Sequence, residues 1–240
     1  MNKYSSLHLG YFDVVEACGE SGCPICRLSR REVKKYLDAI LYDCVTDPDI
    51  RDGLRDSLGY CHTHGWQLST VGRGYLLGIS IIYEDVLDVV QADLQKMRPG
   101  QRKGNPLMRL FSGQKRVSEP DNQNQQSRCP ACLVVEQVET LGLKLLCKAL
   151  GDQDEAMLNA LKDSEGLCLQ HLRQAFASIS DSAVGDLLVA ATRERITDIR
   201  AGLKEFIRKN DHRFQHETIG GERDSWKHAL TFLVGGKDDE

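Results

Sequence analysis

The sequence lacks the long apolar run that a membrane-spanning helix or a secretory signal needs. Its most hydrophobic stretch, residues 75–90, is interrupted by three acidic residues, and residues 1–10 contain no apolar core. We therefore expect no membrane partner. Thiols without an export signal predict a reducing, cytoplasmic location.

Catalytic signatures and strand patterns are missing as well. Neither a GxSxG elbow nor a P-loop is present, so no nucleophile–base pattern identifies a catalytic residue. Alternating apolar and polar residues between hairpin turns are not evident. The net charge of −4 gives no reason to expect a general polyanion-binding surface. These absences argue for a helical binding or structural protein and against an enzyme.

What the sequence does contain is one cysteine–histidine signature, twice. A Cys-Pro-x-Cys pair is followed by a Cys-x-x-His pair, after 34 residues in the first copy and 35 in the second. Three thiols and one imidazole form a zinc finger-like set that binds zinc tetrahedrally and leaves no open position. We predict two structural zinc ions per chain. Their ligands are Cys23, Cys26, Cys61, His64, Cys129, Cys132, Cys168 and His171.

The residues around the Cys-x-x-His pairs indicate an internal repeat. Residues 54–61, LRDSLGYC, align with residues 161–168, LKDSEGLC, at an offset of 107. Two copies that keep every ligand while most other residues differ suggest that the ligands act together. Register with His171 selects His64, and not His62, as the fourth ligand of the first copy.

Two assignments of the ligands to the ions are open. Each half could use its own two pairs, or Cys23 and Cys26 could join Cys168 and His171 in a swapped arrangement. We favour pairing within each half because it needs only one local loop closure.

Other uses of the cysteines are weaker interpretations. An iron–sulfur cluster could use the same residue types, but zinc is more frequent at this spacing. A thiol redox site would require a βαβ context, and nine cysteines without an export signal disfavour disulfides. Cys18, Cys44 and Cys147 lack partners at motif spacing, so we expect them to be buried as small apolar residues.

Helical periodicity dominates the rest of the chain. Apolar stripes of period 3.6 predict long helices at residues 75–97 and 182–210 with a core-facing side. We predict an all-α protein of two pseudo-repeated helical halves, each with a Cys3His zinc knuckle, plus a C-terminal docking helix. The remaining predicted helices are 27–44, 47–57, 133–150 and 152–162. The predicted divisions are a first repeat at 1–97, a basic, Gly/Pro- and Gln-rich linker at 98–128, a second repeat at 129–210 and a C-terminal clasp and helix at 211–240.

The linker region carries the clearest charge anomaly. Residues 94–118 contain seven cations and no acid. Such a segment could bind nucleic acid or another anion, and the residues for that role are Arg102, Lys103, Lys115 and Arg116. We favour a solvated basic loop, because no nucleic-acid-reading motif accompanies the charges.

The C-terminal region is rich in polar residues. Asp224 is a suitable N-cap for a last helix that carries Trp226 and ends near Gly235. A ligand site would be built from His212, Arg213, Glu217, Glu222 and Trp226. We favour instead a structural clasp that docks this helix.

The doubled CPxC…CxxH signature and a KxDxRF…E…DSW tail together resemble a family of uncharacterised prokaryotic proteins. The resemblance implies cytoplasmic metal-binding proteins without an assigned reaction. It supports the eight ligands, draws attention to Arg213, Phe214 and Trp226, and supplies no substrate.

From these observations we expect a zinc-stabilised interaction, adaptor or regulatory module with a protein partner. One alternative is nucleic-acid or anion binding through residues 94–118. The other is an enzyme that uses the zinc knuckles for thiol-redox or metal-transfer chemistry, or the tail as a small-ligand pocket.

Overall fold

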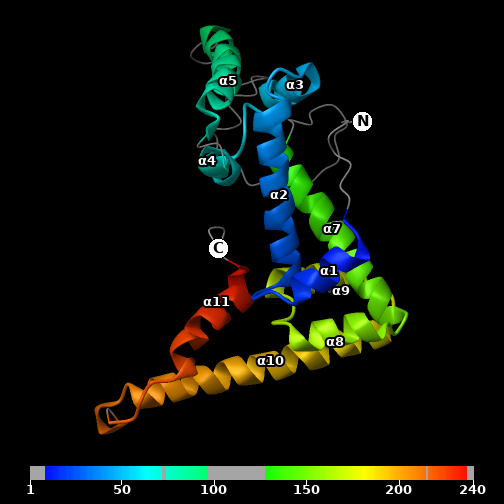
Figure 1. Cartoon of the computed structure of the whole chain (residues 1–240), viewed down its shortest axis with the longest axis vertical. Helices are drawn as coiled ribbons and strands as arrows, with labels where there is room; N and C mark the ends of the chain where they lie inside the picture. Colours follow the sequence, from blue (N-terminus) through cyan, green and yellow to red (C-terminus); the bar gives the residue numbers. More distant parts are fainter. Residues whose placement is uncertain (1–8, 72–73, 97–127, 215, 237–240) are drawn as a thin grey trace. The chain divides into compact units, whose positions relative to one another are not determined.

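The computed structural model describes residues 9–71, 74–96, 128–214 and 216–236 of the chain, and it is drawn in Figure 1. Within these ranges the backbone forms α-helices and short 3-10 helices, and no strand. The predicted all-α fold class is confirmed.

The chain folds into two compact units that are discontinuous in sequence. The described part of unit 1 comprises residues 33–71, 74–96 and 128–134, and that of unit 2 comprises residues 9–32, 135–214 and 216–236. The expected division into sequence repeats at 97/98, 128/129 and 210/211 concerns the duplication and stays a prediction.

Two long helices belong to both units. Helix α2 (Pro24–Asp43) begins in unit 2 and ends in unit 1, whereas α7 (Pro130–Gly151) begins in unit 1 and ends in unit 2. Each has proline as its first residue, where the missing N–H costs no helical hydrogen bond. The predicted helices after the two knuckles are confirmed, and they begin directly at the prolines.

Unit 1 is completed by α3 (Pro48–Asp56), α4 (His62–Val71) and α5 (Leu76–Lys96). Asp47 caps α3, because its carboxylate accepts the N–H groups of Asp49 and Ile50 at 3.0 and 3.2 Å. α3 and α5 are also joined by Asp85, which accepts hydrogen bonds from Arg51 at 3.0 Å and Arg55 at 2.7 Å. The core of this unit is aliphatic. Its members include Leu37, Ile40, Ile50, Leu54, Leu68 and Ile82.

Unit 2 contains a larger set of helices. They are α1 (Tyr11–Cys18), α8 (Glu155–Asp163), α9 (Leu169–Ser178), α10 (Ser182–Lys209), η2 (His212–Phe214), η3 (Gly221–Asp224) and α11 (Ser225–Val234). The α7 and α2 segments approach closely here, since a β-carbon at Gly142 would lie 3.1 Å from Ile25 Cδ1. Burial of each large aliphatic side chain contributes roughly 1.5–3 kcal/mol. This core includes Ile25, Leu28, Leu146, Leu150, Met157 and Leu188.

Some local predictions need correction. The apolar stripe of α5 is not uniformly core-facing, because its members Leu76 and Leu94 are more than half exposed while Val86 is buried. Ile82, which is outside the predicted stripe, is buried as well. The spacing of apolar residues shows which side of a helix is apolar, but not how much of the helix length is covered by neighbouring elements. The stripe of α10 fits better, with Val184, Leu188 and Ile199 buried. Helix α1 was not predicted.

The last helix ends at Val234, as predicted, but its predicted cap is wrong in detail. Asp224 occupies the N-cap position without a side-chain capping hydrogen bond. Its carboxylate instead pairs with Lys227, one helical turn later, at 2.9 Å.

α11 folds back toward α10, as Figure 1 shows. The closest approach is at Gly202 of α10, where a β-carbon would lie 2.2 Å from Ser225 Oγ and 3.1 Å from Ser225 Cβ. Ser225 is buried at this crossing. The absence of a side chain at residue 202 therefore allows the C-terminal helix to dock.

We expect Gly202→Ala to destabilise the protein by about 1–3 kcal/mol, because the added methyl group overpacks the α10–α11 contact. The matched control is Gly53→Ala in α3, where an added β-carbon meets nothing within 4 Å. That control should stabilise by up to about 1 kcal/mol, as alanine is the better helix former. Thermal unfolding followed by circular dichroism measures both, and equal shifts would contradict the proposed close contact.

Candidate metal centres

The eight predicted ligands form two separate groups of four. In unit 2 the group is Cys23, Cys26, Cys168 and His171, and in unit 1 it is Cys61, His64, Cys129 and Cys132. Within each group, the candidate donor atoms all lie within 4.8 Å of one another.

The expected pairing within each sequence half is wrong. Each Cys-Pro-x-Cys pair meets the Cys-x-x-His pair of the other half, which is the swapped arrangement. The reason lies in the helices. α2 has 20 residues and runs about 30 Å away from its own cysteines, and the nine-residue α3 does not bring the chain back to them.

The unit-2 group has the spacing of a tetrahedral zinc site. Sulfurs about 2.3 Å and a nitrogen about 2.1 Å from one ion lie about 3.8 Å (sulfur–sulfur) and about 3.6 Å (sulfur–nitrogen) apart. Here the Cys26 and Cys168 sulfurs are 3.8 Å apart. His171 Nδ1 lies 3.4 Å from the sulfurs of Cys23 and Cys26 and 3.1 Å from that of Cys168.

The unit-1 group has similar spacing. The sulfurs of Cys61 and Cys132 are 3.6 Å apart, which is too far for a disulfide. His64 Nδ1 lies 3.2 Å from Cys61, 3.6 Å from Cys129 and 3.4 Å from Cys132. His64 is the member of this group, as expected from register, whereas His62 is exposed.

All four ligand pairs share one local structure, a helix N-terminus. The first cysteine of each pair directly precedes its helix, and its carbonyl accepts the N–H four residues later. These bonds link Cys23 to Arg27, Cys61 to Gly65, Cys129 to Leu133 and Cys168 to Leu172, at 2.8–3.2 Å. The second ligand of each pair lies three residues after the first, on the same side of the first turn. Two helix N-termini, each with a positive dipole end, therefore converge on each group of cysteines. Backbone N–H groups of the first turn also bond the sulfurs, from Thr63 and His64 to Cys61 and from His171 to Cys168.

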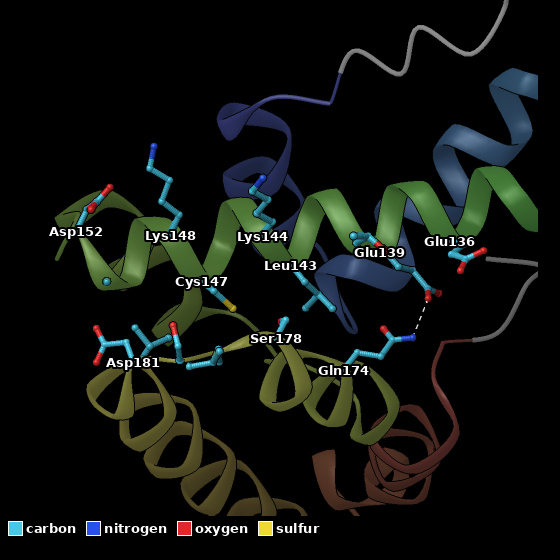
Figure 2. A pocket seen from close by; sticks show the side chains of 15 residues that line it. Glu136, Glu139, Leu143, Lys144, Cys147, Lys148, Asp152, Gln174, Ser178 and Asp181 are labelled. Atoms are coloured by element: carbon cyan, nitrogen blue, oxygen red, sulfur yellow. Dashed lines mark hydrogen bonds between the residues drawn. The ribbon is translucent and has the colours of Figure 1, made fainter. Parts of the chain in front are cut away.

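The unit-2 group is backed by a second layer of polar residues. Glu139 Oε1 of α7 lies 3.0 Å from His171 Nε2, the ring nitrogen that does not face the sulfurs. Its other oxygen accepts a hydrogen bond from Gln174 Nε2 at 3.0 Å, the dashed line in Figure 2. Burial lowers the pKa of His171, but the neighbouring sulfurs and Glu139 raise it by more. The net effect is a pKa of about 11. Binding a metal at Nδ1 would then displace a proton from this imidazole.

A second acid fastens the loop that leads into α9. Glu165 pairs with Arg195 of α10 at 2.9 Å and with His228 of α11 at 3.2 Å. Burial raises the pKa of Glu165, but His228, Arg195 and the backbone N–H of Gly22 lower it more, so the net shift is downward. The Glu165 carboxylate thus links the loop before α9 to α10, to α11 and to the segment before Cys23.

Sequence reasoning missed both acids, although the repeat contains a signal for them. Counted from the Cys-Pro-x-Cys pairs, Glu139 corresponds to Val33, and in the aligned loops Glu165 corresponds to Leu58. An acid in one copy where the other copy has an apolar residue marks a difference between the centres.

Three tyrosines, Tyr36, Tyr60 and Tyr83, lie near enough to Cys129 of the unit-1 group for its charge to raise their pKa values. A β-carbon at Gly65, next to His64, would lie 3.1 Å from Tyr83 Oη. Burial is the main cause that raises the pKa of Tyr36, Tyr60 and Tyr83 above the ordinary value. These phenols therefore stay neutral beside the thiolates.

A groove of about 770 Å³ lies in unit 2 between α7 and the α9–α10 connection. In Figure 2, Leu143 and Cys147 point from α7 toward this connection, while the ammonium groups of Lys144 and Lys148 extend away from it. Glu139 lines one end, so the groove reaches the second layer of the unit-2 group.

The three remaining cysteines lie apart from both groups. Cys18 and Cys44 are buried, as predicted, and Cys147 is half-buried. Burial raises the pKa of Cys18 to about 11 and also raises that of Cys147. The thiols of Cys18 and Cys147 are therefore protonated at neutral pH and poorly reactive.

The candidate tail residues divide into two sets. Glu217 binds Arg208 and Glu222 binds Lys209 at 2.8 Å, so both acids join the tail to the end of α10. His212 and Arg213 are exposed and pair with Asp211 at 3.1 and 2.7 Å. Trp226 is 49 % exposed. This arrangement favours the clasp, and a ligand site here stays a prediction.

Two further expectations concern other parts of the chain. The basic residues proposed for nucleic-acid binding, Arg102, Lys103, Lys115 and Arg116, lie outside the described residues. In the described part of the chain, no helix is long and apolar enough to span a membrane.

Comparison with known proteins places the chain in a family. Residues 9–240 match the model of a family of unknown function, DUF6062. The chain belongs to this family. It is also similar to the uncharacterized 23.9 kDa protein in the xynA 3′ region of Caldicellulosiruptor sp. (strain Rt8B.4), with 23 % identity over 223 residues, 92 % of this chain and 99 % of the relative. No solved structure matches.

We expect Glu139→Gln to weaken metal binding at the unit-2 group by about tenfold to a hundredfold, because a carboxylate behind a histidine ligand orients the ring and raises its basicity. Competition with a chelator of known affinity measures the change. Glu194→Gln, an exposed acid on α10, is the matched control. Equal affinities in both variants would show that Glu139 does not act on the centre.

Proposed function

We propose that the protein is a two-zinc interaction module, in which the ions hold helix N-termini together and a helical surface binds a protein partner. The observation that carries this proposal is the pair of four-donor groups, each with three cysteines and one histidine at tetrahedral spacing. The family match supplies no reaction or substrate.

Zinc fits these donors best. Three thiolates and a neutral imidazole suit a borderline-soft ion without a geometric preference of its own. An iron–sulfur cluster bonds its ligands to different irons, so its cysteines must lie farther apart than ligands of one ion. Donors within 4.8 Å of one another fit a single ion.

A structural role for zinc follows from the number of donors. Four protein ligands leave no coordination position for substrate, and a position opens only if a ligand departs. Binding also contributes to folding, on the order of 10 kcal/mol for comparable sites, because ligands 68 and 145 residues apart are joined at one point.

A surface on α11 supports the interaction role. Trp226, Leu230 and Leu233 are each about half exposed and recur at helical spacing along the side that does not carry the buried Ser225. Apolar rows of this kind on a stable scaffold are typical of helix-mediated protein recognition. Reduced, metal-binding thiols suit a cytoplasmic location.

The two alternatives have less support. The tail acids are engaged by Arg208 and Lys209, which reduces the case for a small-ligand enzyme at the tail. Nucleic-acid binding through residues 94–118 rests on charge alone.

Zinc content tests the centres and their swapped ligand assignment together. The full chain should contain two zinc ions. Cys26→Ser with Cys168→Ser removes two ligands of one centre, so one ion should remain. Cys26→Ser with Cys61→Ser damages both centres and should leave almost none. Elemental analysis of the purified proteins gives the counts.

The two double variants distinguish the swapped ligand assignment from pairing within each half. Pairing within each half would reverse the results of the two double variants. His62→Ala should retain both ions, since this histidine is outside the group. A wild-type chain with substantially fewer than two ions would count against the proposal.

The α11 surface is tested with Leu230→Glu, which places a charge in the centre of the apolar row. The variant should retain two zinc ions and its melting temperature, yet lose at least about tenfold in affinity for a protein that the wild type binds, because a buried charge costs several times RT. Lys204→Glu, an exposed position on α10, is the control for added charge. If the wild type and Leu230→Glu bind the same proteins with equal affinity, the α11 surface is not the binding site.

A further inference from the structure

The two centres differ in how far solvent reaches their ligands. In the unit-2 group Cys23, Cys168 and His171 are each only 2 % exposed, and Cys26 alone is partly accessible. In the unit-1 group the accessibility is reversed. All three cysteines are partly exposed, and only His64 is buried.

The residues behind the ligands differ in the same direction. Glu139 lies against His171, and Glu165 ties the loop before Cys168 to two other helices. At the repeat-equivalent positions, the first copy has Val33 and Leu58. These apolar residues add no negative charge and no fixed ion pair to a centre.

The C-terminal helix adds a cover to the unit-2 centre. Gly235, just after α11, has φ +90°, and a β-carbon there would lie only 3.4 Å from Cys26 Sγ. The end of α11 therefore lies against the one accessible sulfur of this group. The Gly202–Ser225 contact and the His228–Glu165 pair hold α11 in this position.

These differences bear on metal exchange. A competing ligand must approach the ion and bond to it while a protein ligand departs. A centre with three partly exposed cysteines offers such an approach, whereas buried donors under a docked helix do not. A nearby carboxylate also makes the histidine a stronger ligand.

We propose, on the basis of the zinc centres assigned above, that the unit-2 centre holds its ion permanently and the unit-1 centre exchanges its ion with soft-donor ligands. The exchange partner is a chelate of thiolate or imidazole donors, small enough to reach Cys61, Cys129 and Cys132. No oxidation occurs. Metal–sulfur bonds to the protein break as bonds to the chelate form, and the released thiolates take up protons from water.

The test is the kinetics of metal release from the full chain. A chromogenic pyridylazo chelator in excess is mixed with protein that contains two zinc ions. We expect one equivalent to leave quickly and the second at least about tenfold more slowly, a difference of the size that second-layer groups produce. Glu139→Gln should accelerate the slow phase and leave the fast phase unchanged.

The two tryptophans assign the phases without altering any ligand. Trp66 lies on α4, two residues after His64, and Trp226 lies on α11 in unit 2. Cobalt bound to thiolates absorbs in the near ultraviolet and quenches tryptophan emission. In cobalt-loaded Trp226→Phe, which retains Trp66, emission should recover in the fast phase. In cobalt-loaded Trp66→Phe, emission of Trp226 should recover in the slow phase.

The outcomes separate this inference from the function proposed above. Fewer than two bound ions would remove the centres and the inference together. Two ions released at one rate, or recovery of Trp226 before Trp66, would overturn the inference and leave two structural zinc sites in place.

Discussion

The structure depends on one interaction, the convergence of two helix N-termini on a single group of soft donors. The same three-residue spacing at the start of a helix occurs four times, and each time it supplies the first ligand just before the helix and the second ligand in its first turn. Helix dipoles and first-turn N–H groups favour thiolates at this place. A metal ion bound to such a set of ligands would contribute on the order of 10 kcal/mol, comparable to the whole stability of an ordinary domain. A bound ion would therefore help to position α2, α4, α7 and α9, the helices that begin at the ligand pairs.

The swapped ligand assignment has a topological consequence. α2 starts at the unit-2 centre and leads the chain to the ligand pair of the unit-1 centre, and α7 does the reverse. Neither sequence half contains a complete group of four. A half on its own could complete a centre only with a second copy of itself. The two compact units of the structure thus cut across the sequence repeat.

Much of this could be predicted from the sequence. Ligand spacing and the repeat identified the eight residues that the structure gathers into two groups, and apolar periodicity located the long helices, because both signals depend only on local geometry. The pairing failed because it was argued from loop closure. Extending a loop from about 35 to about 145 residues costs only about 1 kcal/mol, far less than a zinc site contributes. The length of α2, which is readable from its periodicity, was the stronger argument.

Glu139 and Glu165 were missed because a single acid on a helix or loop has no pattern until the two copies are compared position by position.

The comparison of the copies shows what duplication preserves and what it changes. The four donors, the prolines at the helix starts and the helix order recur, since these select the ion and build the tetrahedron. The positions behind the donors do not recur, with Glu139 and Glu165 in one copy and Val33 and Leu58 in the other. The residue after the last described helix, Gly235, lies against Cys26 of the unit-2 centre. Donor identity determines which ion binds, whereas burial, second-layer charge and the cover determine how easily a ligand reaches it. Two centres with the same donors can therefore differ in lifetime while each still holds its pair of helices.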